Sequence, residues 1–66
     1  MTKTDLLKVK KAIAKKAHIK NIDCIENINI LECPEFEGAI VITAQINNEK
    51  YEAIFENGEV REVNNI

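Results

Sequence analysis

The sequence predicts an α+β domain in which one N-terminal helix packs on a four-stranded antiparallel β-meander. Apolar residues recur every three or four positions near the N-terminus and every second position afterwards. The chain has 66 residues, of which 45% are hydrophobic and 30% charged, and a chain of this length builds only one core. Residues 1–66 are therefore expected to form a single domain.

Residues 4–18 are predicted to form the helix. Thr2 and Asp5 have the spacing of a capping box at its start, and Asn21 is the expected end. The apolar residues that recur at spacings of three and four are Leu6, Val9, Ile13 and Ala17. That spacing places them on one side of a helix, which predicts an amphipathic element that covers the sheet.

Alternating apolar and β-branched residues predict the four strands, at residues 24–33, 37–46, 49–56 and 59–63. Asn57-Gly58 is the strongest turn signal, because a type I′ turn needs positive φ at both positions. Asn47-Asn48 predicts a second two-residue turn, and residues 34–36 a three-residue loop.

These turns fix the pairing of the strands and thereby the two faces of the sheet. They place Ile42 opposite Ala53 and Ile28 opposite Ile42. The face that the helix should cover then carries Cys24, Ile28, Ile30, Ile40, Ile42, Ala44, Ile46, Tyr51, Ala53, Phe55 and Val60. Glu62 is expected to point inward on the last strand, where a charge protects a sheet edge. The opposite, open face carries the apolar residues Ile25, Leu31, Val41, Ile54 and Val63.

Charge is divided unevenly along the chain. Residues 1–20 contain seven lysines and one aspartate, and residues 21–66 contain ten acids, one lysine and one arginine. The simple interpretation is a solvated basic helix beside a solvated acidic sheet. The alternative is a bipolar surface that steers a charged partner.

The residue inventory argues against an enzyme. His18 with Cys24 or Cys33 is the only nucleophile–base combination, and nothing places a third, orienting group. We therefore expect no catalytic residue and no cofactor. The eight residues between the cysteines do not match a zinc site, so no metal is expected.

The cysteines also bear on location. Two reduced thiols fit a cytoplasmic protein. The chain has no apolar run of the roughly 20 residues that a membrane span needs, and the N-terminal lysines are not followed by the apolar segment of a signal peptide.

Three surfaces could bind a partner. The acidic surface consists of Glu32, Glu35, Glu37, Glu52, Glu56 and Glu59. The open sheet face offers Val41, Ile54 and Val63 to a protein partner or to a second copy in a homodimer. The basic stripe of Lys8, Lys11 and Lys15 could follow a phosphate backbone. That stripe contains no arginine and no aromatic residue, and the acidic sheet would repel nucleic acid, so a protein partner is favoured.

The order of elements resembles the PepSY domain. The residues that carry the resemblance are the alanine-rich helix at 11–17, the strand at 50–55 and the final turn and strand at 57–63. The chain departs from the family at Glu56, where an aspartate is usual, and at Asn57, where a threonine is usual. The resemblance implies a non-catalytic module that inhibits a protein partner, in a family that is mostly extracytoplasmic.

The prediction for function is therefore a small protein-binding or inhibitor module. The short chain, rich in lysine, asparagine and isoleucine, is compatible with a phage or mobile-element inhibitor. An anti-CRISPR protein that blocks a nucleic-acid-binding groove is one example of that class. Weak nucleic-acid binding through the lysine-rich helix is the remaining alternative.

Overall fold

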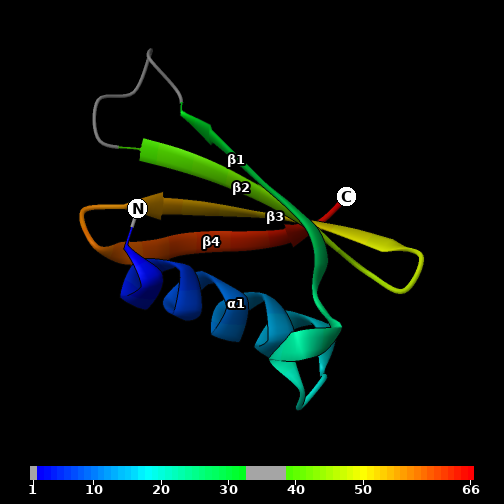
Figure 1. Cartoon of the computed structure of the whole chain (residues 1–66). Coiled ribbons are helices and arrows are strands. Elements are labelled where there is room, and N and C mark those ends of the chain that lie inside the picture. Colours follow the sequence, from blue (N-terminus) through cyan, green and yellow to red (C-terminus); the bar gives the residue numbers. More distant parts are fainter. Residues whose placement is uncertain (1, 33–38) are drawn as a thin grey trace.

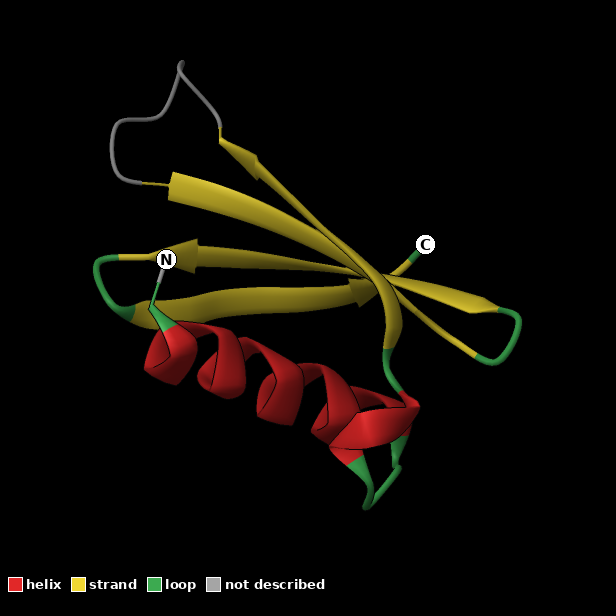
Figure 2. Ribbon diagram, in the orientation of Figure 1, coloured by secondary structure: helices red, strands yellow, loops and turns green. Residues whose placement is uncertain are grey.

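The computed structural model describes residues 2–32 and 39–66, and it confirms the predicted α+β fold (Figure 1). Helix α1 is followed by a short 3₁₀ turn, η1, and by four strands that form one antiparallel sheet in the order β1-β2-β3-β4. The elements are α1 (Lys3–Ala17), η1 (Ile22–Cys24), β1 (Glu26–Glu32), β2 (Ala39–Ile46), β3 (Glu49–Glu56) and β4 (Glu59–Asn65). Figure 2 shows that α1 covers one face of this sheet.

Both ends of α1 are capped. The backbone N–H of Asp5 donates to Thr2 Oγ1 at 3.1 Å and that of Thr2 to Asp5 Oδ2 at 3.4 Å, which confirms the capping box. The helix ends at His18, which has a left-handed φ of 58°, and the N–H of Ile19 donates to the carbonyl of Ala14 at 3.0 Å. This 6→1 bond is typical of a helix C-terminus. The helix therefore ends before Asn21, which instead caps η1.

Next to their turns, the hairpins β2–β3 and β3–β4 have the residue pairs that the turns predict. Ile42 lies opposite Ala53, Val41 opposite Ile54, and the turn residues Asn57 and Gly58 have φ values of 53° and 78°. Two positive φ values are the requirement of a type I′ turn, which explains why asparagine and glycine stand there.

The prediction for the first strand is wrong at its start. Cys24 lies in η1 and is exposed, whereas the alternation predicts that it points inward from a strand. A bulge between Glu26 and Asn29, with Asn27 at a φ of 52°, inserts one extra residue. An extra residue reverses which face the preceding side chains reach. Ile25 is therefore in the core at 8% exposed, and not on the open face.

The β1–β2 register also differs from the expected one. Ile30 lies opposite Ile42, whereas the three-residue loop would have placed it opposite Ile40. The difference is two residues, so both isoleucines still belong to the helix-facing side.

The last strand has a bulge of its own. Phe55 pairs with Val60, but Ile54 pairs with Glu62, so that Arg61 is the extra residue. Val63 consequently lies opposite Ala53 and packs against the core, and Glu62 lies on the open face. Both placements reverse the prediction for these residues, because the expected register contained no bulge.

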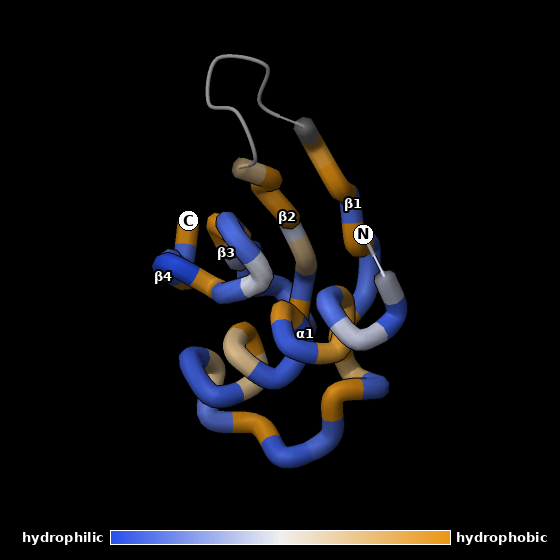
Figure 3. The backbone as a smooth tube through the Cα atoms, turned by 90° about the vertical axis from the view of Figure 1, so that its left-hand side faces the viewer, coloured by the Kyte–Doolittle hydropathy of each residue, from blue (hydrophilic) through white to orange (hydrophobic). Residues whose placement is uncertain are grey.

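The core lies between α1 and the sheet; the helix packs mainly on β4 and β3, and the buried strand residues come from β2 and β3. Its buried residues are Val9, Ile13, Ala14, Ile25, Ile42, Ala44, Ile46, Tyr51, Ala53 and Phe55. Coverage by the helix ends within β1: Ile28 packs against the core, but Ile30 is 46% exposed, although its neighbour Ile42 is 0% exposed. Figure 3 shows the hydrophobic end of β1 lying away from α1.

Candidate protein-interaction surface

An apolar row crosses the open face of the sheet. Leu31 of β1 lies opposite Val41 of β2, and Val41 lies opposite Ile54 of β3. Leu31 is 55% exposed, and Val41 and Ile54 are half-buried. No described helix or strand packs on this face, since α1 lies on the other one (Figure 2). We call Leu31, Val41 and Ile54 the apolar row.

Acidic side chains border the apolar row. Glu52 and Glu56 flank Ile54 on β3 and share its face, because every second residue of a strand points the same way. Glu56 accepts a hydrogen bond from Arg61 at 2.9 Å, in an ion pair whose side chains are 30% and 62% exposed. Such an exposed pair stabilises little. With Ile54 and Glu62 these two residues line a shallow hollow of about 320 Å³.

The structure thus joins parts of two surfaces that were predicted separately. Glu52 and Glu56 of the acidic surface lie beside Val41 and Ile54 of the open face. Glu59 is exposed at the start of β4, opposite Glu56. Glu35 and Glu37 lie outside the described residues, and so does the side chain of Glu32 at the end of β1.

The structure corrects the set of residues predicted for the open-face site in two ways. Val63 does not belong to it, because the bulge in β4 turns this side chain toward the helix. Leu31, which the sequence places on this face but not in the partner-binding set, belongs to the site. Its pairing with Val41 is the signal that identifies it.

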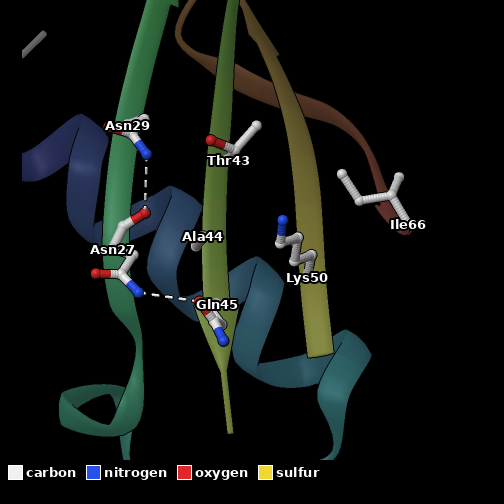
Figure 4. A pocket seen from close by; sticks show the side chains of 7 residues that line it. All are labelled: Asn27, Asn29, Thr43, Ala44, Gln45, Lys50 and Ile66. Atoms are coloured by element: carbon white, nitrogen blue, oxygen red, sulfur yellow. Dashed lines mark hydrogen bonds between the residues drawn. The ribbon is translucent and has the colours of Figure 1, made fainter. Parts of the chain in front are cut away.

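The other end of the open face is lined by amide side chains, most of them joined by hydrogen bonds (Figure 4). Asn27 Nδ2 donates to Gln45 Oε1 at 2.9 Å, and Asn29 Nδ2 donates to the carbonyl of Asn27 at 3.2 Å. Gln45 Nε2 donates to the carbonyl of Asn47 at 3.0 Å. These bonds tie the β1 bulge to β2, so the amides have a structural role beside a shallow hollow of about 320 Å³.

The basic stripe lies on helix α1, whereas the acidic border lies on the sheet. Lys8, Lys11 and Lys15 are exposed on α1, and Lys15 borders a hollow together with Val63 of β4. Lys8 Nζ donates to the carbonyl of Gly58 at 3.1 Å, which ties the helix to the β3–β4 turn. One of the three ammonium groups therefore already has a protein partner.

Reactive side chains are scattered. Within residues 2–32 and 39–66, no three histidine, cysteine or acidic side chains gather as metal ligands would. His18 and Cys24 are both exposed, at the end of α1 and in η1. Cys33 lies outside the described residues.

Within the described part of the chain, the single α-helix is too short and too polar to cross a bilayer. No protein-family model, curated protein or solved structure matches the chain. The resemblance to the PepSY domain therefore stays a prediction.

Proposed function

We propose that the chain is a non-catalytic protein-binding module that docks a partner on its open sheet face. The observation that carries the proposal is the direct pairing of Leu31, Val41 and Ile54 across three strands, beside Glu52 and Glu56. An apolar centre with a polar rim is the usual composition of a protein interface. Apolar side chains gathered on an uncovered face also mark interaction sites.

The border of the apolar row indicates the charge of the partner. Glu52, Glu56 and Glu62 lie near the row, and Arg61 offsets only one of them. Electrostatic complementarity favours a partner that presents lysine or arginine around an apolar centre. A basic groove of a nucleic-acid-binding protein has this chemistry, and a phage or mobile-element inhibitor such as an anti-CRISPR protein would act by occupying it.

The charge pattern favours this reading over two alternatives. Two open faces in a homodimer would bring acidic borders together, which costs free energy unless every charge is paired. Nucleic acid on the basic stripe would have to compete with the bond from Lys8 to Gly58, and would approach an acidic sheet.

The test is affinity capture from the source cells with the tagged chain, followed by mass spectrometry, for matched pairs of variants. Ile54→Lys and Glu52→Lys alter the open face. Leu7→Lys and Glu49→Lys make the same chemical changes elsewhere, at exposed positions on the helix and at the start of β3. We expect the first pair to lose the captured protein and the second pair to retain it, with more capture at low salt than at high salt.

Circular dichroism and thermal unfolding establish that each variant is folded. A partner that a folded Ile54→Lys variant still captures would refute docking on the open face. A partner lost only on replacing Lys8, Lys11 and Lys15 by alanine would assign binding to the basic stripe instead.

A further inference from the structure

The two edges of the sheet differ in how well they are protected. Each edge strand pairs on one side only within the described residues, β1 with β2 and β4 with β3. Most of β4 is polar and exposed: Glu59, Arg61, Glu62, Asn64 and Asn65. Charged residues on an edge discourage the addition of further strands.

The edge of β1 lacks this protection beyond its bulge. Residues Asn29 to Glu32 pair regularly with β2, and the apolar pair Ile30 and Leu31 is 46% and 55% exposed. The two side chains point to opposite faces of the sheet, as neighbours in a strand do. An apolar, regular edge of this kind is a template for another strand.

Backbone chemistry determines what can occupy such an edge. In an antiparallel ladder, alternate residues direct their N–H and C=O groups to the neighbouring strand, and the others direct theirs outward. An extended segment can satisfy the outward groups of β1 with main-chain hydrogen bonds. Its own side chains would then lie beside Ile30 on one face and beside Leu31 on the other.

We propose that β1 accepts an extended apolar segment with basic flanks, from a partner protein, as a fifth strand of the sheet. The acidic charge of the sheet favours such a segment over a second copy of the chain. Glu26 and Glu32 stand at the two ends of β1, and residues 21–66 contain ten acids against two bases. Two such sheets side by side would repel each other, whereas a lysine or arginine flank would lie close to Glu26 at the start of β1.

This inference goes beyond docking on the open face. Ile30 lies on the helix-facing side, whereas Ile54 lies on the open one, so the two sites can be removed separately. A partner that uses both would lay its added strand next to Leu31, the first residue of the apolar row.

The probe is a capped synthetic peptide of alternating valine and threonine with two lysines at each end. It is titrated into the ¹⁵N-labelled chain, and backbone amide shifts are followed by NMR. We expect saturable binding, with shifts centred on Asn29, Ile30 and Leu31 and slower hydrogen exchange of the outward amides of β1. A peptide with glutamate flanks should bind about tenfold more weakly, because a like charge then meets Glu26 and the acidic sheet.

Two controls separate strand addition from other binding. Ile30→Lys should weaken binding about tenfold, whereas Asn65→Lys makes the same change in net charge at the β4 edge and should leave it unchanged. Ile30→Thr serves the same purpose if Ile30→Lys does not fold. A peptide N-methylated at every valine and threonine has no main-chain donor left on either edge of that segment and should not bind.

Three results would overturn the proposal: no binding at about 1 mM peptide, shifts confined to β4 or to Val41 and Ile54, or equal binding of the N-methylated peptide. Docking on the open face would survive each of them, because it depends on Ile54 and Glu52. Conversely, the loss of partner capture by Ile54→Lys would leave the peptide titration unaffected.

Discussion

β1 and β4 are both edge strands and each contains one bulge, yet α1 covers them to different extents. β4 lies over α1. The extra residue Arg61 changes the face that the following side chains reach, so Val63 packs against the core. The reversal in β1 brings Ile25 into the core, but the strand then leaves the helix and Ile30 remains 46% exposed. Bulges therefore decide which residues face the helix, and the position of the helix decides which of those are buried.

The largest predicted difference in stability is between alanine substitutions at Ile42 and Ile30, which lie opposite each other. Ile42→Ala should cost about 3–4 kcal/mol of unfolding free energy, because Ile42 is fully buried. Ile30→Ala should cost less than about 1 kcal/mol, because nearly half of Ile30 already contacts solvent. Urea unfolding followed by circular dichroism measures both values. Equal losses would show that α1 covers β1 as fully as it covers β2.

A smaller effect tests the bulge in β4. Val63→Asp should cost about 2 kcal/mol, because it places a carboxylate among half-buried apolar residues. Glu62→Asp should change the stability by less than about 0.5 kcal/mol, since Glu62 is exposed on the open face. The same unfolding experiment measures this pair. In a register without the bulge Val63 would face solvent, and Val63→Asp would be nearly neutral.

The smallest effect compares the extra residues of the two bulges. Asn27→Ala should cost about 1 kcal/mol, because it puts a less tolerant residue at a φ of 52° and removes the bond to Gln45. Arg61→Ala should cost less than about 0.5 kcal/mol, since it removes only an exposed ion pair. Asn27→Gly should recover the part of the loss that is due to φ. If Asn27→Ala is neutral in thermal unfolding, the left-handed conformation does not contribute.

The sequence contains enough local information for the helix and the two C-terminal hairpins. Thr2 and Asp5 mark the start of α1, and Asn57-Gly58 requires a tight turn with positive φ. Strict alternation between these turns then pairs Val41 with Ile54 and places both on the open face, where alternation along the first strand also places Leu31.

The two bulges could not be found by alternation alone, because that pattern assumes that no residue is extra. A trace of each bulge is nevertheless present. Ile25 and Ile28 are three residues apart and both contact the core, as do Val60 and Val63. A spacing of three inside a strand indicates an inserted residue. The exposure of Ile30 had no local signal, since it depends on where α1 packs on the sheet.

The packing of α1 on β3 and β4 also has a consequence for biosynthesis. Helix α1 is synthesised before the strands on which it packs, and β4 follows it only after roughly 40 further residues, a delay of a few seconds at about 5–20 residues per second. An isolated helix of 15 residues is only marginally formed in water. Its lysines would keep this nascent segment soluble during the wait, and the domain would close in one late step once β4 has emerged.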